Sequence, residues 1–476
     1  MKYTDLYVNG KWISGSLGNR FDVINPADET VLASVASAEI DDARMALDAA
    51  EEAFGSWARK APRERAEILR KAFEIMSSEK EMFARLITLE NGKGQTDAMG
   101  ESTYAAEFFR WFSEEAVRSE GLLSRGPSSN ARIMVQNKPA GIAVLVTPWN
   151  YPAAMGTRKI APALAAGCPV IIKPASETPL TMLALMPLLE EAGVPPGIVN
   201  VLPSRNTGPL VDNMLHDPRV RVVSFTGSTQ TGRKLLHSAA DNVLKPAMEL
   251  GGNAPLLVLE DADIDVAVDG AMLAKMRNLG EACTAANRFY VSKKIAEEFT
   301  KKFTKRMAAL KLGNGLDPTV DVGPLINADT RNKVAAFVQD ALNKGAKLEL
   351  GGKLPEGKGY YYPPTVLSNV SLDAECVHDE IFGPVAAIQT FDSEDDAVAR
   401  ANDTEYGLVA YVFTKDLKRG LKISERLDYG MIGLNRGLVS DPAAPFGGTK
   451  QSGLGREGGH EGMLEFMESQ YISVDW

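Results

Sequence analysis

The fold is decided by the stretch Phe225-Thr-Gly-Ser-Thr-Gln-Thr-Gly232, which joins an apolar run to a helix-compatible run. The run before it, 220–225, is apolar enough for a buried strand, and residues 229–240 have the spacing of a helix. Glycines and free backbone N–H groups at the start of a helix allow an anion to approach closely. The spacing is not the common GxGxxG, so this turn alone also fits a plain connection.

Similar alternation of apolar and helix-compatible stretches extends on both sides of this turn. Earlier apolar runs lie at 141–146, 170–173 and 198–202, and 178–191 is helix-compatible. This pattern predicts a parallel, doubly wound sheet. A second series follows Glu249, with strands at 288–291 and 385–391 and helices at 264–279, 296–310 and 395–401. We therefore expect a second α/β unit.

The remaining segments predict helices that pack around the first sheet and a small separate feature. The N-terminal third is predicted to be mostly helical, with stretches at 41–53, 63–77 and 103–118. Residues 120–136 are rich in turn-forming residues, and 471–474 are strand-like. Two such isolated segments could pair as an arm between subunits.

Composition places the chain among folded globular proteins. Its 476 residues are 45% hydrophobic and 24% charged, and the length predicts at least two domains. The formal net charge of -10 disfavours nucleic acid and anionic membrane surfaces as partners, because both require a clustered basic face. No apolar stretch approaches a membrane span, so we expect a cytoplasmic protein.

Cysteine and histidine usage limits the possible chemistry. Cys168, Cys283 and Cys376 are an odd number of cysteines without CxxC spacing, which predicts free thiols and not a disulfide scaffold. The four histidines are too far apart for a zinc-binding pattern, and we expect no metal. At least one thiol is therefore a candidate for chemistry.

Further motifs follow in a characteristic order: Thr147-Pro-Trp-Asn-Tyr-Pro152, Lys173-Pro-Ala-Ser-Glu-Thr-Pro179, Glu249-Leu-Gly-Gly-Asn253, Gly280-Glu-Ala-Cys283, Glu380-Ile-Phe-Gly-Pro384 and Pro445-Phe-Gly-Gly448. Each is weak alone, but together they resemble the aldehyde dehydrogenase superfamily over essentially the whole chain. The resemblance implies an α/β fold with a Rossmann-type cofactor domain, an α/β catalytic domain and a small β oligomerisation arm. It also implies a homodimer or homotetramer.

The resemblance also implies domain bounds. We expect an NAD(P)-binding domain from 1–118 and 139–249 and a catalytic domain from 250–447. The oligomerisation arm and the C-terminal segment are expected from 119–138 and 448–476.

Cys283 matches the family's nucleophile. A thiolate adds to an aldehyde to give a thiohemiacetal, which can lose hydride to a nicotinamide and leave a thioester for water to hydrolyse. A free cysteine is more often a small buried hydrophobe, the interpretation we accept for Cys168 and Cys376. Glu281 departs from the uncharged residue usual in relatives, and we expect it to raise the pKa of the thiol.

Two further residues match catalytic positions by resemblance. Asn150 would donate its amide to the developing oxyanion, together with the backbone N–H of Cys283, although an asparagine beside prolines is usually a turn former. Glu249 would be the general base for the thiol or the hydrolytic water, although it could instead be a solvated strand end. The match to the family favours the catalytic interpretation of both.

The expected cofactor is NAD(P). The residues expected to bind it are Thr147, Pro148, Trp149, Lys173, Ser176, Gly227, Ser228, Gly232, Leu250, Glu380 and Phe382. Lys173, which is also expected to serve catalysis, would hold the adenosine ribose. Relatives strict for NAD often carry a glutamate where Ser176 stands, so Lys173 is free to meet a 2′-phosphate and NADP is favoured over NAD.

The substrate is expected to carry a carboxylate. The chain resembles most closely the succinate-semialdehyde dehydrogenase branch, in which residues matching Arg158, Arg277 and Ser440 bind the substrate's distal carboxylate. The alternative is that these arginines are solvated or salt-bridged. Arg436 and Ala285 depart from that branch. The tunnel is expected to be shaped by Tyr104, Phe108, Trp111 and Tyr151.

Rival functions stay open at this point. They are oxidation of another semialdehyde or of an aliphatic or aromatic aldehyde, CoA-acylating dehydrogenation, NAD(P) binding without turnover, and thiol-dependent hydrolysis without redox chemistry. The glutamate at 249 favours hydrolysis of the thioester over transfer to CoA, because CoA-acylating relatives generally lack it.

Overall fold

The computed structural model describes residues 2–475, and its first half is built on a mixed sheet. Within the described residues this sheet has eight strands in the order β2-β1-β9-β8-β7-β10-β11-β21. The five central strands are parallel: β9 (Val199–Val201), β8 (Val170–Lys173), β7 (Ile142–Val146), β10 (Val220–Thr226) and β11 (Lys245–Glu249). The antiparallel edges are β2 (Lys11–Ile13), β1 (Leu6–Val8) and β21 (Gly453–Leu454).

Helices cover both faces of this sheet, which explains why its strands are continuous apolar runs. One face packs on α1 (Ile40–Arg59), α7 (Thr207–Leu215) and α8 (Thr229–Asp241). The other packs on α2 (Pro62–Ser78), α3 (Lys80–Asn91), α4 (Gln95–Glu115), α5 (Ala154–Ala166) and α6 (Leu180–Ala192). Side chains of β7 alternate between the two cores, with Val144 in one and Leu145 in the other.

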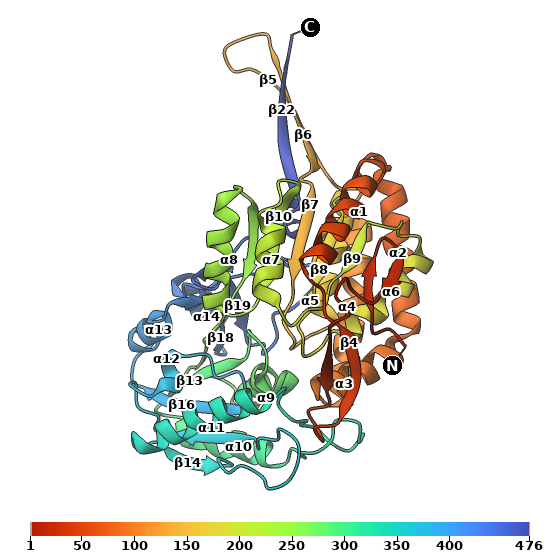
Figure 1. Cartoon of the computed structure of the whole chain (residues 1–476). Helices are drawn as coiled ribbons and strands as arrows, with labels where there is room; N and C mark the ends of the chain where they lie inside the picture. Colours follow the sequence, from red (N-terminus) through yellow and green to blue (C-terminus); the bar gives the residue numbers. More distant parts are fainter. Residues whose placement is uncertain (1, 476) are drawn as a thin grey trace.

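A second sheet lies below the first in Figure 1. Its strand order is β14-β15-β16-β13-β12-β18-β19, and only the β14–β15 pair is antiparallel. The strands are β14 (Lys347–Leu350), β15 (Thr365–Ser368), β16 (Val385–Phe391), β13 (Ala286–Ser292), β12 (Ala254–Val258), β18 (Val409–Phe413) and β19 (Met431–Leu434). Its helices are α9 (Ile264–Met276), α10 (Ala296–Ala308), α11 (Ala328–Asn343), α12 (Glu375–His378), α13 (Glu394–Asn402) and α14 (Leu417–Arg426).

The expected helices of the N-terminal third are present, but the strands ahead of them were not predicted. Besides β1 and β2, β3 (Arg20–Ile24) and β4 (Val31–Ala36) form a separate antiparallel pair. Strands of three to six residues are too short to show a clear period of two in the sequence. Two further short elements, β17 (Tyr406–Gly407) and β20 (Thr449–Lys450), pair with each other, and α15 (Glu461–Leu464) lies near the C-terminus.

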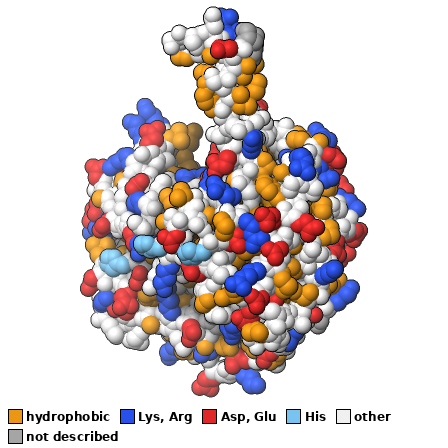
Figure 2. Space-filling view, turned by 45° about the horizontal axis from the view of Figure 1, so that its top comes forward, with side chains coloured by type: hydrophobic (Ala, Val, Ile, Leu, Met, Phe, Trp, Pro, Cys, Tyr) orange, Lys and Arg blue, Asp and Glu red, His pale blue; other side chains and the backbone are white. Residues whose placement is uncertain are grey.

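A three-stranded arm projects from the body of the molecule (Figure 1). It consists of β5 (Leu122–Arg125), β6 (Arg132–Pro139) and β22 (Met467–Val474), so the two isolated segments predicted from the sequence do pair. Figure 2 shows hydrophobic side chains gathered on this projection. Leu123 and Tyr471 on its strands are 61% and 60% exposed.

The strand order brings the sequence motifs together. The chain runs from β7 outward to β9 on one side and then to β10 and β11 on the other, so the winding reverses between β7 and β10. Ligands of doubly wound sheets bind at the carboxyl ends of the strands beside such a reversal. Motifs that begin at Thr147, Lys173, Phe225 and Glu249 stand at these ends.

The domain bounds stay a prediction. The residue ranges of the strands in the two sheets can be compared with them. All strands of the second sheet lie within 250–447, and β21 is the strand of the first sheet that lies outside the predicted first domain. No helix among residues 2–475 is both long enough and apolar enough to cross a membrane.

Candidate active site

A cavity of about 250 Å³ lies between the carboxyl ends of the first sheet and the amino ends of β12, β13 and β16. Its lining unites nine of the residues singled out from the sequence: Pro148, Trp149, Asn150, Gly227, Ser228, Leu250, Cys283, Glu380 and Phe382. These residues come from five separate segments of the chain. The cavity is therefore the candidate active site.

The loop that carries Cys283 begins with a sharp change of direction after helix α9. Asn278 and Leu279 have left-handed backbone angles (φ 51° and 43°), which non-glycine residues rarely adopt. The loop also passes so close to Gly252 that a Cβ there would lie 2.4 Å from the carbonyl oxygen of Cys283. The kink and the glycine together place Cys283, which is half-buried, against the cavity.

The thiol of Cys283 is protonated at rest. Burial raises its pKa to about 12, and the carboxylate of Glu380 adds to the effect while Arg158 opposes it. The thiol therefore requires a base before it can act as a nucleophile. Glu281 was expected to raise this pKa, but its carboxyl group is directed away, where it accepts a hydrogen bond from the backbone N–H of Ile326 at 3.1 Å.

Asn150 is held beside the nucleophile loop by backbone contacts. Its Nδ2 donates to the carbonyl of Glu281 at 3.0 Å, which leaves the second hydrogen of the amide for a ligand. Asn278 donates from its own Nδ2 to the carbonyls of Asn150 at 3.0 Å and Glu281 at 2.8 Å. Asn278 thus ties the two segments together, a role that sequence reasoning missed because asparagine in a turn carries no distinctive signal.

Glu249 ends strand β11 and is 3% exposed, so it is not a solvated strand end. Its Oε2 is buried and has no hydrogen-bond partner among the described residues. Burial, followed by repulsion from Glu457, raises its pKa well above the usual range of a carboxyl group, although Arg158 and Lys159 oppose this. Glu249 does not line the cavity with Cys283, but its charge acts on the thiol.

A buried group of charges surrounds Glu249. Glu457 forms ion pairs with Arg158, whose Nε lies 2.6 Å from Oε2, and with Lys159, which also donates to Ser224 at 2.9 Å. Neither Lys159 nor Glu457 was singled out from the sequence. Arg158, expected to bind substrate, is thus already paired, yet its Nη2 has no partner among residues 2–475.

The other two predicted substrate residues contact each other. Nη1 of Arg277 donates to Oγ of Ser440 at 3.3 Å. The guanidinium of Arg277 lies 5.7 Å from the ring centre of Tyr104 and 5.2 Å from that of Tyr151. The hydroxyl groups of both tyrosines are buried and have no partner among the described residues. Two buried O–H donors beside a cation form a suitable receptor for an anion.

Phe108 and Trp111, also expected in the tunnel, occupy different positions. The ring of Phe108 meets that of Tyr104 edge to face, with ring centres 4.8 Å apart, and lies 5.6 Å from the guanidinium of Arg158, which is consistent with a tunnel wall. Trp111 donates its indole N–H to the carbonyl of Gly459 at 3.0 Å. Trp111 therefore holds the C-terminal segment.

The residues at the ends of the first sheet fit a dinucleotide. Ser228 caps helix α8 by accepting from the N–H of Thr231, and the helix start with Gly227 and Ser228 borders the cavity. Gly232 lies in the first turn, where a Cβ would be 2.3 Å from Leu250. Thr147 follows β7 and is buried. Oγ1 of Thr226, beside Gly227, is buried without a partner among the described residues.

Lys173 ends strand β8, and burial lowers its pKa to about 8. Ser176 follows on the same loop and donates to the carboxylate of Glu177 at 3.2 Å. Glu177 also acts on Lys173 by its charge, so an acid lies one position after Ser176, the position where NAD-specific relatives often carry a glutamate.

The opposite wall of the cavity is aromatic and acidic. The rings of Trp149 and Phe382 meet edge to face at 5.3 Å. Phe382 has a left-handed backbone (φ 55°), a strained conformation that clusters at functional sites. Glu380 accepts from the N–H of Gly252 at 3.2 Å, and burial raises its pKa to about 7.

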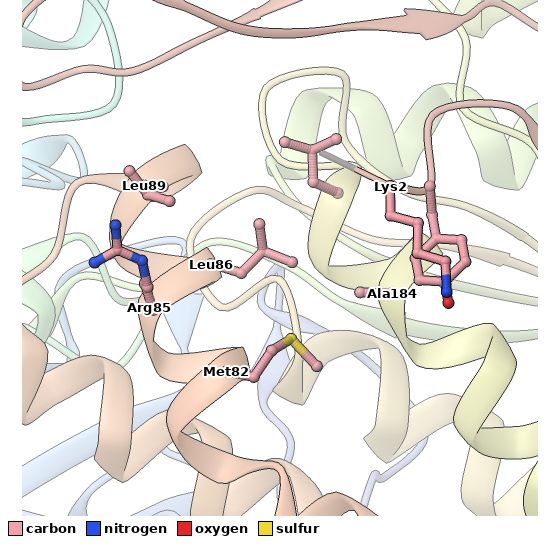
Figure 3. A pocket seen from close by; sticks show the side chains of 8 residues that line it. Lys2, Met82, Arg85, Leu86, Leu89 and Ala184 are labelled. Atoms are coloured by element: carbon pink, nitrogen blue, oxygen red, sulfur yellow. The ribbon is translucent and has the colours of Figure 1, made fainter.

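A separate apolar hollow of about 450 Å³ lies near the N-terminus. Figure 3 shows Met82 and Leu86 between Arg85 on one side and Ala184 and Lys2 on the other. Its lining residues are mostly apolar and include no cysteine, histidine or carboxylate. The chemistry therefore belongs to the cavity at Cys283.

Comparisons with known proteins agree with this geometry. A model described as the aldehyde dehydrogenase family matches residues 12–472. A succinate-semialdehyde dehydrogenase of Paenarthrobacter nicotinovorans is 52% identical over 93% of this chain and 99% of its own length. An NADP+-dependent succinate-semialdehyde dehydrogenase of Escherichia coli strain K12 is 44% identical over 98% and 97%. The crystal structure of a succinate-semialdehyde dehydrogenase from Burkholderia pseudomallei superimposes with a TM-score of 0.98 at 42% identity, over 99% and 98%.

Proposed function

The chain belongs to the aldehyde dehydrogenase family, and from this premise we propose that it oxidises succinic semialdehyde to succinate with NADP+. The observation that carries the proposal is the position of Cys283: it borders a cavity that suits a dinucleotide and lies close enough to Tyr104 and Tyr151, the tyrosines beside Arg277, to be coupled to them electrostatically. An aldehyde and a distal carboxylate can thus be met by one continuous site.

Catalysis starts with loss of the Cys283 proton to a base, a role suited to Glu249, whose free oxygen has no other partner. The thiolate attacks the aldehyde carbon, and the oxyanion of the thiohemiacetal accepts from Nδ2 of Asn150 and the N–H of Cys283. The bound dinucleotide supplies the hydride acceptor. Loss of the hydride leaves a thioester on Cys283. After Glu249 has released the thiol proton to solvent, it deprotonates a water that attacks the thioester, and the acid leaves as the Cys283 thiolate is restored.

The distal carboxylate of the substrate is proposed to lie at Arg277 and Ser440. The unpartnered hydroxyls of Tyr104 and Tyr151 supply two further donors. Arg158 contributes a positive potential to the same region while its ion pair with Glu457 stays in place.

A kinetic matrix tests this function. Succinic semialdehyde, glutaric semialdehyde, an uncharged aliphatic aldehyde of equal length and an aromatic aldehyde are each assayed with NAD+ and NADP+, with and without CoA. We expect the highest kcat/KM for succinic semialdehyde and no requirement for CoA. Equal kcat/KM for the uncharged aldehyde, or a strict need for CoA, contradicts the proposal.

The cofactor preference follows from Lys173 and Ser176. We propose that protonated Lys173 contacts the 2′-phosphate of NADP+. Ser176 is small and uncharged, so it neither blocks nor repels this phosphate. Because burial lowers the pKa of Lys173 to about 8, the lysine loses its charge as the pH rises above this value. The KM for NADP+ should then rise more steeply with pH than the KM for NAD+.

A pair of variants checks the same preference at constant pH. Ser176→Glu places a carboxylate beside the phosphate site and should lower kcat/KM for NADP+ by about 10-fold or more relative to NAD+. Glu177→Gln removes the neighbouring acid and should change the ratio in the opposite direction. Equal use of both cofactors by all three proteins at pH 7 and pH 9 contradicts the assignment.

The arm is proposed to join two or more copies of the chain. Its outer strand β22 and the edge strand β19 each have a free edge within the described residues, and the exposed side chains of Leu123 and Tyr471 favour burial. Light scattering is expected to give a multiple of 51.3 kDa that matches a homodimer or homotetramer. The cytoplasm is the proposed location, because Cys283 must stay a free thiol and the three cysteines form no disulfide.

A further inference from the structure

Glu281 occupies a position from which it can control the geometry of catalysis without touching the substrate. Its backbone carbonyl accepts hydrogen bonds from both Asn150 at 3.0 Å and Asn278 at 2.8 Å. It stands two residues before Cys283. Any shift of Glu281 therefore moves the proposed oxyanion donor and the nucleophile together.

The side chain of Glu281 is buried in a place with few partners. The residue is 0% exposed. Oε1 accepts one hydrogen bond, from the N–H of Ile326, and Oε2 has no partner among residues 2–475. A charged carboxylate with so few hydrogen bonds costs more free energy in the interior than a neutral carboxylic acid does.

The charges around Glu281 are already balanced without it. The preceding loop and helix α4 contribute Lys93, Asp97 and Glu101, and the segment of Glu281 itself contributes Arg277 and Cys283. The stretch 322–326, which packs on the carboxyl group, has no titratable side chain. The two cations thus equal the two other carboxylates in number, and no counterion remains for a third.

Lys93, whose charge acts on Glu281, forms its contacts with other groups. Nζ of Lys93 lies 2.5 Å from Oε2 of Glu101, donates to the carbonyl of Asn150 at 2.7 Å and sits 4.0 Å above the ring of Tyr151. Lys93 makes no ion pair with Glu281. Burial accordingly raises the pKa of Glu281 well above the usual range of a carboxyl group.

We propose that Glu281 is a positioning residue that works as an uncharged carboxylic acid. In this state it anchors the nucleophile loop to the segment at Ile326, and loss of its proton at alkaline pH displaces the carbonyl that orients Asn150. The inference rests on the proposed function for its kinetic consequence, but its structural consequence can be measured without turnover.

The kinetic test compares the wild type with Glu281→Gln, Glu281→Ala and Glu90→Gln at saturating NADP+ and substrate. Glutamine keeps the acceptor for Ile326 and never ionises. We expect kcat of the wild type to fall on the alkaline side by up to about 10-fold per pH unit, as for one proton, and E281Q to keep a plateau there. E281A should lose about 10-fold in kcat at neutral pH with little change in KM.

Glu90→Gln is the matched control. Glu90 is also a fully buried acid, whose pKa burial raises to about 8, but it accepts from the N–H groups of Leu180 and Thr181 and has no contact with the nucleophile loop. The kcat profile of E90Q should follow the wild type at alkaline pH. A wild-type-like kcat in E281A overturns the positioning role.

The structural test measures the unfolding midpoint Tm from about pH 6 to about pH 9. The unfolded chain releases the Glu281 proton near the ordinary carboxyl pKa, whereas the folded chain retains it, so the wild type loses stability as the pH rises toward the folded pKa. The difference between the Tm of E281Q and the Tm of the wild type should therefore become more positive with each increase in pH. A Tm difference that stays constant with pH overturns the proposal that Glu281 is uncharged. Absence of turnover by the wild type on every aldehyde tested overturns only the proposed function.

Discussion

Replacement of Cys283 by alanine is expected to lower kcat by on the order of 10⁴-fold or more and to leave the fold intact. The thiol forms the covalent bond that every later step requires, and no other cysteine is among the residues that line the cavity. Its protonated resting state does not weaken this expectation, because burial that raises the pKa to about 12 also makes the thiolate reactive once a base has removed the proton.

The two other cysteines provide matched controls for this variant. Cys168 and Cys376 are fully buried, and burial raises the pKa of their thiols to about 11 and about 12. Cys168→Ala and Cys376→Ala should keep kcat within about twofold while losing roughly 1 kcal/mol of stability for the removed sulfur. Cys283→Ala with an unchanged Tm and a kcat near that of these controls would refute the mechanism.

Arg277→Gln is expected to reduce kcat/KM for succinic semialdehyde by roughly 10²-fold, corresponding to about 3 kcal/mol. Removal of the guanidinium leaves the buried carboxylate of the substrate without its counterion. An uncharged aldehyde of equal length makes no use of that cation, so its kcat/KM should change by about twofold or less. The ratio of the two values, measured for wild type and variant, isolates recognition of the carboxylate from any general loss of activity.

Arg277 is a better choice for this experiment than Arg158. Arg158 and Lys159 share Glu457, and removal of one partner from a buried ion pair typically costs about 3–5 kcal/mol of stability. Arg85→Gln, at the rim of the apolar hollow, removes a surface arginine and should leave both substrates unaffected. An equal loss for charged and uncharged aldehydes in Arg277→Gln would show that the arginine shapes the tunnel and does not bind the carboxylate.

The central part of the fold could be predicted because its strands are buried on both faces. The runs at β7, β8 and β10 are continuous and apolar, and the helices between them have the matching period. β1 and β2 could not be predicted in the same way. They are three residues long, and their place at the sheet edge depends on pairing between Tyr7 and Val201, which no local pattern encodes.

Site residues whose side chains would take part in the reaction or bind the cofactor could be predicted from the sequence. Residues that only hold other residues in place could not. Cys283, Asn150 and Glu380 were found because their motifs, each weak alone, together resemble one family, and the three residues line one cavity. Asn278 was missed because its role depends on a left-handed turn that brings its amide to two carbonyls. Glu281 was expected to act on the thiol, but side-chain direction is set by the fold.

The ion pairs of Glu457 also have a consequence for synthesis on the ribosome. Arg158 and Lys159 emerge about 300 residues before their carboxylate, and strand β11 precedes its neighbour β21 by about 200 residues. The first domain therefore cannot complete its interior while it is the only part made. A chain released before Glu457 would hold two buried cations without their carboxylate and would be exposed to proteases.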